Sequence, residues 1–353
     1  MMVQIAYVHK RELVEEDHLS KFSLDVLNRC VYPYQGSEDP DVVLGTTFGE
    51  DVSLTRVGND LLASHIDPII GAIKDIGWLA VHISCNDIAT SGIPPRWILV
   101  LVIVPSADDE ELLEEIMSDI DRAAKDIGVT IIGGHSGYSS GITRPLVSVT
   151  ALGTASSRTP VRTSGAQVGD HILVTKGIAL EGTAILASDF SDIAAQKGLQ
   201  EKDIQKAEEL FQNISVIDEA LLLALMGATA MHDVTRGGIL ETLLEISHLS
   251  EVGMEVDYER IPIPDTVEKF SDAFQFDPLQ MISSGTLVAT IAEENLEKAQ
   301  RSLRDKGILF GDIGKVVEGE GVVLHREGKT AHYTGIQAEK DELARMWETY
   351  PRD

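Results

Sequence analysis

The chain contains 353 residues, of which 29 are Lys or Arg and 57 are Asp or Glu, so its formal net charge is −28. Nucleic acids and anionic membranes attract cationic protein surfaces, and this charge balance therefore argues against both as partners. A hydrophobic content of 43% is that of a folded protein, and the length favours two domains over one.

Signals for export, membrane insertion and cross-linking are weak. The segment 1–20 is charged from His9 onward and lacks the apolar core of a signal peptide. The longest apolar run, 97–104, is far shorter than the roughly 20 residues of a membrane helix. Cys30 and Cys85 stand outside any C-x-x-C pair, which argues against a disulfide framework or a cysteine zinc site. We therefore expect a cytoplasmic protein.

The first half of the chain alternates β-prone and helical segments. The turn 58–60 is typical of a hairpin, and Gly92 followed by two prolines is a strong helix stop. One helix is predicted over 73–91 and another from a capping box near Ser106. Strands are predicted at 42–44, 52–57, 61–66, 97–104, 129–132 and 146–152. This order predicts an α/β domain that ends near residue 155.

A change of composition separates the second half. The segment 154–169 is rich in Ser, Thr, Gly, Pro and Arg, and we take it as the boundary between domains at 1–155 and 160–353. Strands are predicted at 171–175, 253–256, 285–291, 310–317 and 321–325, and helices within 180–227, 239–249, 295–305 and 338–350. The predicted fold class is therefore α/β (α+β), with two domains.

Three acidic residues lie on or beside apolar segments. Asp87 shares one face of a predicted helix with Leu79 and Ile83, and a buried carboxylate without a partner is very unfavourable. Asp67 directly follows a predicted strand, and Asp51 lies at a glycine turn. Mg²⁺ takes few protein carboxylates and completes its shell with phosphate oxygens and water, so these acids suit a magnesium site. A turn or capping role is the alternative for each of them.

Two glycine-rich segments are candidates for phosphate binding. The run from Gly133 to Gly141 is predicted as a loop after a strand, and its glycines would let backbone N–H groups approach a phosphate. It matches neither the P-loop nor the dinucleotide-binding pattern, and an ordinary flexible loop is the alternative. The segment 232–238 opens the helix predicted from Ile239 and can hold an anion and its metal. An N-cap role for Thr235 is the alternative there.

Zinc binding and covalent catalysis find little support. His65, His82 and His135 lack the short spacing of zinc ligands, so we interpret them as polar loop histidines. The sequence contains no G-x-S-x-G pattern, and nothing marks either cysteine as a nucleophile.

Taken in order, these segments resemble the aminoimidazole ribonucleotide synthase (PurM-like) superfamily, which includes the hydrogenase maturation factor HypE, thiamine-monophosphate kinase and selenophosphate synthetase. The resemblance covers nearly the whole chain, and its specificity lies in the ordered set of motifs. Gly49-Glu50-Asp51 looks like the G-D-D turn of the family, Asp67 like its T-D strand end, Asn86-Asp87-Ile88-Ala89 like its N-D-x-A helix, Gly133-Gly134-His135-Ser136 like its G-G-D-T loop, and 233–238 like the D-x-T-R-G-G motif of the HypE branch.

The resemblance implies an N-terminal domain that forms a dimer barrel with a second copy, an α+β C-terminal domain, and ATP with Mg²⁺ bound between them. It also implies transfer of the γ-phosphoryl group of ATP to an oxygen of an acceptor. By the same resemblance, the metal ligands are Asp51, Asp67, Asp87 and Asp233. The residues in contact with the phosphates would be Asn86, Gly133, Gly134, His135, Ser136, Arg236, Gly237 and Gly238.

The sequence departs from the family pattern at several places. His135 replaces an aspartate, which removes one metal ligand, and the chain ends in Asp353, whereas HypE carries its substrate group on a C-terminal cysteine. The catalytic lysine pattern of the selenophosphate branch does not follow Cys30, and Arg236 begins a segment where the kinase branch has an aspartate–glycine pair.

Our leading hypothesis is an ATP- and Mg²⁺-dependent, HypE-related enzyme that phosphorylates an amide or carbonyl oxygen. Its acceptor would be a small molecule or a group carried by a protein, and a kinase similar to thiamine-monophosphate kinase is a second enzyme option. The alternative class is a non-catalytic, nucleotide-binding regulatory or scaffold protein. Formation of ADP that depends on an acceptor would separate the two classes.

Overall fold

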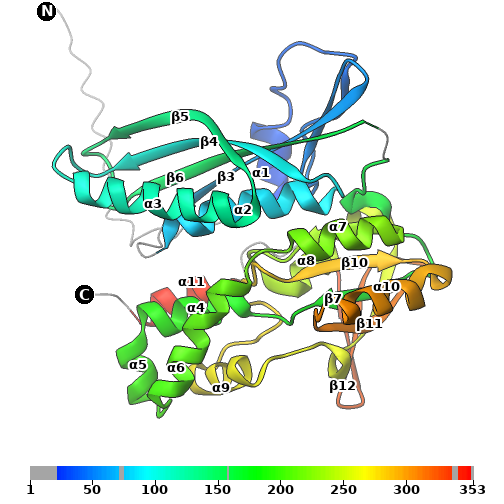
Figure 1. Cartoon of the computed structure of the whole chain (residues 1–353). Helices are drawn as coiled ribbons and strands as arrows, with labels where there is room; N and C mark the ends of the chain where they lie inside the picture. Colours follow the sequence, from blue (N-terminus) through cyan, green and yellow to red (C-terminus); the bar gives the residue numbers. More distant parts are fainter. Residues whose placement is uncertain (1–21, 71–74, 157–158, 336–340, 351–353) are drawn as a thin grey trace, which may run out of the picture.

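The computed structural model describes residues 22–70, 75–156, 159–335 and 341–350, which form two β-sheets with helices packed against them (Figure 1). The strands of the first sheet come from residues 42–155, and those of the second sheet come from residues 171–333. The predicted α/β (α+β) class is confirmed. Within these described ranges, no helix has both the length and the apolar character that a membrane crossing requires.

In the described part of the first half, six strands form a sheet in the order β1-β2-β3-β6-β4-β5. β4 and β5 are parallel, and the other neighbours are antiparallel. The strands are β1 (Val42–Leu44), β2 (Ser53–Val57), β3 (Asp60–Ile70), β4 (Pro95–Val104), β5 (Thr130–Tyr138) and β6 (Leu146–Ala155). The helices of this half are α1 (Leu24–Cys30), α2 (Ile76–Thr90) and α3 (Glu110–Ile127).

The two faces of the first sheet differ in burial. Along β4, Ile98 and Val100 are at most 4% exposed and belong to the same buried cluster as α2 and α3, which cover this face. Alternate side chains of a strand point to opposite faces, and Leu99 between them is 38% exposed. Leu99 lies in one row with Thr150 and with Ile66, which is 64% exposed. This second face is therefore apolar and partly open in the single chain.

The second sheet, as far as the structure describes it, contains seven strands in the order β13-β12-β9-β11-β7-β10-β8. β9 and β12 are parallel, and the other neighbours are antiparallel. The strands are β7 (His171–Thr175), β8 (Ala228–Asp233), β9 (Gly253–Asp257), β10 (Leu287–Ile291), β11 (Phe310–Val317), β12 (Gly321–Arg326) and β13 (Lys329–Tyr333). The helices are α4 (Leu180–Asp189), α5 (Ser191–Gln196), α6 (Glu201–Glu208), α7 (Ile217–Met226), α8 (Gly238–Ser250), α9 (Asp265–Phe274), α10 (Glu293–Asp305) and α11 (Glu342–Thr349).

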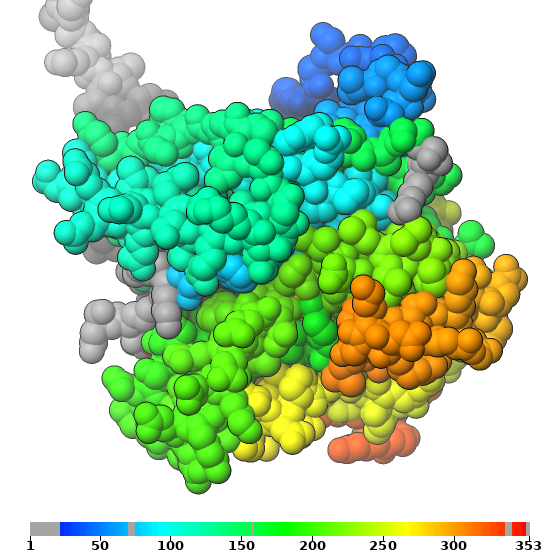
Figure 2. Space-filling view, viewed as in Figure 1, coloured from blue at the N-terminus to red at the C-terminus, as the bar shows by residue number. Residues whose placement is uncertain are grey.

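Helices α7 and α8 lie on opposite faces of the second sheet. On β7, Leu173 packs in the buried cluster of α7 and α10, whereas Ile172 and Val174 pack in the cluster of α8. Because α7 also contacts α2, it lies between the two sheets (Figure 1). The cluster on this side contains residues of both halves, so the two sheets share one continuous core, and the space-filling view shows the two halves in contact (Figure 2). The domain limits at 155 and 160 stay predictions.

Among the described residues, every predicted strand and helix has a counterpart. The strands β8 and β13, the helices α1 and α9, and the short 3-10 helices Thr163–Gly165 and Tyr258–Arg260 were not predicted. Strand β3 continues to Ile70, so Asp67 lies inside a strand and not after one. The helix predicted over 73–91 begins at Ile76, with 71–74 outside the described residues. Residues 336–340 of the predicted C-terminal helix also lie outside them, and α11 covers the remainder.

The prediction of a glycine-rich loop from Gly133 was wrong at its start. Residues 133–138 are part of the edge strand β5 and pair with β4. At Gly134 an added Cβ would lie 2.0 Å from the carbonyl oxygen of Val100, so glycine allows the two strands to approach each other. Nor are the three histidines loop residues, because His65 lies on β3, His82 on α2 and His135 on β5.

Candidate metal centre

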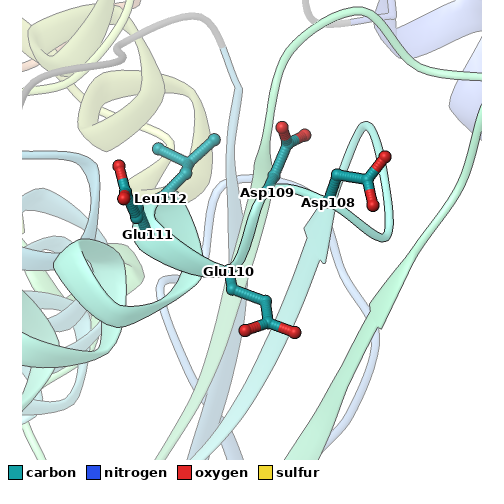
Figure 3. Close-up of a pocket in the computed structure, with 5 residues that line it drawn as sticks. All are labelled: Asp108, Asp109, Glu110, Glu111 and Leu112. Atoms are coloured by element: carbon teal, nitrogen blue, oxygen red, sulfur yellow. The ribbon is translucent and has the colours of Figure 1, made fainter.

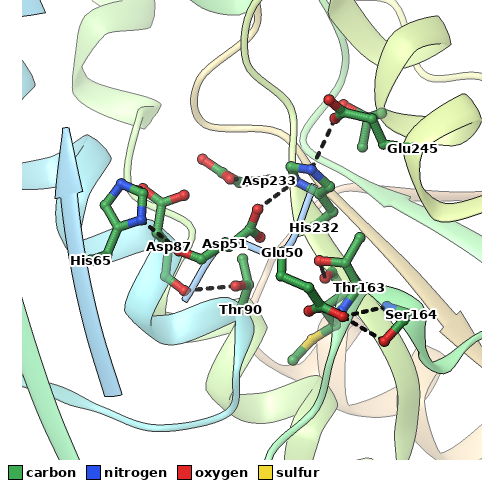
Figure 4. Close-up of polar contacts among 12 residues, drawn as sticks. Glu50, Asp51, His65, Asp87, Thr90, Thr163, Ser164, His232, Asp233 and Glu245 are labelled. Carbon is green, nitrogen blue, oxygen red and sulfur yellow. Dashed lines mark hydrogen bonds and ion pairs between the residues drawn. The ribbon is translucent and has the colours of Figure 1, made fainter. Parts of the chain in front are cut away.

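Carboxylates from both halves of the chain meet between the two sheets (Figure 4). Asp51 follows the turn at Gly49, whose φ of +69° favours glycine, and leads into β2. Asp87 lies on α2, a helix buried along nearly its whole length, and Asp233 is the last residue of β8. The three acids are 9%, 6% and 0% exposed, respectively. Ionised carboxylates so deeply buried require a compensating charge.

Electrostatic effects within the cluster are strong. Burial raises the pKa of Asp51 to about 8. The neighbouring carboxylates Asp233 and Glu245 add to this rise, whereas His232 and a hydrogen bond from Thr90 lower the pKa. Burial, followed by Asp233, Asp51 and then Asp67, raises the pKa of Asp87 well above its usual range. The carboxylates therefore disfavour one another's ionised form, and a bound divalent cation would remove that penalty.

The four acids predicted as metal ligands are thus neighbours. Asp51, Asp87 and Asp233 form the buried part of the cluster, and half-buried Asp67 of β3 acts on Asp87 through its charge. Oδ2 of Asp51 and both carboxylate oxygens of Asp233 are buried without a hydrogen-bond partner among the described residues. Oxygen atoms in this condition are suitable ligands for a divalent cation such as Mg²⁺.

Two histidines, His65 and His232, also lie within the cluster. The sequence analysis predicted neither of them as a metal ligand. Nδ1 of His65 is 2.5 Å from the backbone oxygen of Asp51, and its Nε2 is 3.2 Å from Oδ2 of Asp87. Burial lowers the pKa of His65, which favours the neutral ring. Nδ1 of His232 is 3.2 Å from Oδ1 of Asp51, and its Nε2 is 3.1 Å from Oε2 of Glu245 on α8.

Signals for both histidines were present in the sequence. Residues i and i+2 of a strand share a face, so His65 would have been grouped with Asp67 had the strand been extended by a few residues. His232 immediately precedes Asp233, but without strand β8 its direction could not be inferred. Glu245 had no comparable signal, because it lies in the middle of a predicted helix.

The predicted phosphate-binding residues fall into three groups. The Asn86 side chain is fully buried and bonds to the backbone, since its Nδ2 donates to the oxygen of Ile214 and its Oδ1 accepts from the N–H of Val216, both at 2.8 Å. Residues 133–136 lie on the edge strand β5, and all four are exposed. Arg236, Gly237 and Gly238 occupy the turn between β8 and α8, beside Asp233.

The turn between β8 and α8 is shaped for glycine. Gly237 and Gly238 have φ values of +82° and +66°, and a Cβ at Gly238 would lie 2.5 Å from the oxygen of Leu279. Arg236 points its guanidinium to Asp341, 3.3 Å away, whose carboxylate also caps the N-terminus of α11. The helix N-terminus and the arginine make this turn a suitable place for an anion.

Glu50 connects the first half to the start of the second. Its carboxylate accepts hydrogen bonds from the N–H groups of Thr163 at 3.1 Å and Ser164 at 3.3 Å, and from the Ser164 hydroxyl (Figure 4). Because Glu50 directly precedes Asp51, these hydrogen bonds fix the backbone beside Asp51 to the segment that begins the second half.

A second group of acids differs from this cluster in exposure. Residues 108–112, at the start of α3, line an open hollow of about 480 Å³ (Figure 3). The four carboxylates there are on the surface or half-buried and can be hydrated. They need no cation for their charge, and we assign them no site.

Comparison with known proteins places the chain in a family. The N-terminal and C-terminal domain models of the AIR synthase related proteins match residues 49–155 and 167–327. A putative hydrogenase expression/formation protein of Methanocaldococcus jannaschii is 30% identical over 271 residues, which are 74% of this chain and 77% of that protein. Carbamoyl dehydratase HypE of Rhizobium leguminosarum bv. viciae is 29% identical over 247 residues, covering 66% of this chain and 65% of that one.

The fold agrees with that assignment. A solved structure of the hydrogenase maturation protein HypE in complex with ATP superimposes with a TM-score of 0.67 and 22% identity, over 89% of this chain and 95% of that one. Two sheets with a shared core and an acidic cluster between them define an α/β protein of the PurM-like fold. The chain belongs to the AIR synthase-related family, as the order of its motifs predicted.

Proposed function

We propose that this protein is an ATP-dependent enzyme that transfers the γ-phosphoryl group of ATP to an oxygen atom of an acceptor. The observation that carries the proposal is the set of buried carboxylates with unpartnered oxygens beside the anion-binding turn at Arg236. The names of two relatives support it, since one is a carbamoyl dehydratase and a protein of the same fold was solved with ATP.

In this proposal, the residues between the two sheets have three different roles in phosphoryl transfer. Asp51, Asp87 and Asp233 would hold a divalent cation, whose role when bound is to neutralise negative charge on the phosphates. The N-terminus of α8 and the Arg236 guanidinium would bind the phosphates, which requires Arg236 to exchange its contact with Asp341. Burial between the two sheets would exclude water, so the carboxylates act in a medium of low dielectric constant.

The acceptor belongs to the same proposal. Phosphorylation of an amide or carbonyl oxygen converts it into a leaving group, which suits the removal of water, and one relative is named a carbamoyl dehydratase. We propose an acceptor of this amide or carbonyl class, on a small molecule or carried by another protein.

A homodimer is also part of the proposal. The open face of the first sheet presents a row of apolar side chains, including Ile66 and Leu99, that a second copy of the chain would cover. Light scattering coupled to gel filtration is expected to give twice the mass of the chain. A single-chain mass at micromolar concentration would contradict this part of the proposal.

Calorimetric titration of ATP into the full chain tests the proposed function. We expect binding in the presence of Mg²⁺ and a loss of at least tenfold in affinity with EDTA. Formation of ADP is then measured with a panel of amides and carboxylates, with Asp87→Asn as the inactive control. Absence of nucleotide binding under both conditions would overturn the proposal, and binding without turnover across the panel would favour a regulatory or scaffold protein.

A further inference from the structure

His232 holds a position that a purely carboxylate metal site does not explain. We propose that His232 is itself a ligand of the resident cation through Nδ1, and that the site therefore prefers a transition-metal ion such as Mn²⁺ over Mg²⁺. The inference rests on the proposed function only for the presence of a cation at the acidic cluster.

The first argument is the geometry around Nδ1. This nitrogen lies 3.2 Å from Oδ1 of Asp51 and 3.7 Å from Oδ1 of Asp233, and one donor atom from each of the three residues falls within 4.8 Å of the others. The side chains of His232, Asp51 and Asp233 are 6%, 6% and 0% exposed. Nδ1 therefore faces both carboxylates from within ion-pairing distance.

The second argument is the environment of the opposite ring nitrogen. Nε2 of His232 is 3.1 Å from Oε2 of Glu245, whose side chain is 5% exposed on α8. Nδ1 points to Asp51 and Asp233 (Figure 4). When a cation takes the place of the Nδ1 proton, a carboxylate at Nε2 keeps the remaining ring proton and orients the Nδ1 lone pair toward the metal. A carboxylate behind a histidine is the usual way in which proteins orient a metal-binding imidazole.

An ion pair without metal explains less of the structure. An imidazolium between Asp51 and Glu245 would neutralise part of the charge. It would still leave Oδ2 of Asp51 and Oδ2 of Asp233 buried and unpartnered. One cation bound by Asp51, His232 and Asp233 gives each of these groups a partner.

The donor set determines the class of metal. Mg²⁺ prefers oxygen ligands in an octahedral shell, whereas imidazole nitrogen favours first-row transition metals. A site of one nitrogen and several carboxylate oxygens therefore binds Mn²⁺, Co²⁺ or Zn²⁺ more tightly than Mg²⁺.

Pulsed electron paramagnetic resonance of the full chain loaded with Mn²⁺ tests the assignment, because a nitrogen ligand modulates the electron spin echo at ¹⁴N frequencies. We expect ¹⁴N modulation in the wild type and its loss in His232→Gln, together with a fall of about tenfold to a hundredfold in Mn²⁺ affinity. Mg²⁺ affinity should change less. His325→Gln is the matched control, since His325 on β12 also pairs with a carboxylate, Glu255 at 2.9 Å, but its side chain is 42% exposed.

Glu245 is a positioning residue in this scheme, and its variants test the orientation of the ring. Glu245→Ala should weaken Mn²⁺ binding about tenfold or more, and Glu245→Gln, which keeps a hydrogen-bond acceptor, should restore most of the affinity and the ¹⁴N signal. Circular dichroism in EDTA verifies that each variant is folded.

The possible outcomes separate the two proposals. Mn²⁺ that binds tightly without ¹⁴N modulation would overturn the role of His232 and leave the cation site of the proposed function intact. Equal Mn²⁺ affinities of wild type and His232→Gln would do the same. If neither Mn²⁺ nor Mg²⁺ binds to the wild type, both proposals fail.

Discussion

Asn86 of the first half and Val216 of the second are joined by a 2.8 Å hydrogen bond, in which the backbone N–H of Val216 donates to the side-chain oxygen of Asn86. The amide nitrogen of Asn86 donates to the oxygen of Ile214, so this one side chain bonds to both ends of a short segment before α7. All of these groups are buried, and water cannot replace the asparagine if it is removed.

We therefore predict that Asn86→Ala lowers the free energy of unfolding by about 2–4 kcal/mol, since each buried group left unpaired costs roughly 1–3 kcal/mol. Urea denaturation followed by circular dichroism measures the change. Asn28→Ala, on the exposed side of α1, is the control and should alter stability by less than about 0.5 kcal/mol. A similar value for both variants would show that the bridge is not structural.

Asp87→Asn should separate stability from metal binding. The amide of Asn carries no negative charge, so the variant avoids both the burial of a carboxylate and its repulsion from Asp233 and Asp51. In EDTA the variant should therefore unfold at the same temperature as the wild type or at a higher one. Metal at 100 times its Kd should stabilise the wild type by about 2.7 kcal/mol and the variant by almost nothing. Asp108→Asn, at the exposed start of α3, should behave as the wild type in thermal unfolding. A full metal-dependent shift in Asp87→Asn would remove this residue from the site.

His82 makes stability depend on pH. It packs against the ring of Trp78 at a centroid distance of 4.3 Å, and burial lowers its pKa from 6.5 to about 4. Above pH 6.5 the ring is neutral in both the folded and the unfolded state. As the pH falls from 6.5 to 4, protons bind the unfolded chain first, so stability decreases by up to about 3 kcal/mol and then levels off.

Urea midpoints measured between pH 8 and 4 check this dependence. The variant His82→Leu should lose the part of the slope that His82 supplies, whereas His325→Gln should keep it. Identical slopes in wild type and His82→Leu would show that the pKa of His82 is the same in the folded and the unfolded chain.

Gly134→Ala should damage the edge of the first sheet. Its Cβ would approach the oxygen of Val100 to 2.0 Å, and relief of this clash requires β5 to move away from β4. We expect a loss of about 2–3 kcal/mol in stability. Gly141→Ala is the control, because its Cβ would lie 3.5 Å from the Ser139 hydroxyl, an ordinary van der Waals contact. Amide hydrogen exchange should show faster exchange in β5 in the first variant, and unchanged exchange there would contradict the expectation.

The contact between Arg236 and Asp341 should limit nucleotide affinity. Asp341→Asn keeps a side chain that caps α11 but loses the charge that pairs with Arg236. We expect ATP to bind about two- to fivefold more tightly, which corresponds to the usual strength of a partly exposed ion pair. Calorimetry makes the comparison, with Glu342→Gln as the neighbouring control. A weaker affinity in Asp341→Asn would mean that Asp341 supports the arginine in its binding position.

The sequence predicted the framework better than the site. Helix α3 has a strong signal because its apolar residues repeat every 3.6 positions, whereas α2 is apolar nearly all round and is marked mainly by the stop at Gly92. The motif order led to the carboxylates of the cluster, including Asp51 at its glycine turn and Asp233 ahead of the glycine pair 237–238.

The missing part of the site depends on long-range packing. His232 reaches Asp51 across 181 positions of the chain, and neither residue has a local pattern that contains the other. The glycines from Gly133 were interpreted as a loop because their composition suits one, whereas pairing with β4 decides their conformation. Local composition cannot show that a neighbouring strand passes close to Gly134.

The acidic cluster is divided between the two halves, so the proposed cation would link them. Asp51 and Asp87 come from the first half, and His232 and Asp233 come from the second. If the proposed cation is bound by these residues, a motion that separates the sheets would pull its ligands apart, so the ion would leave only as fast as the junction opens. The dissociation rate of the metal would then report the rate of opening, and a fragment containing either half by itself would lack two of the four residues.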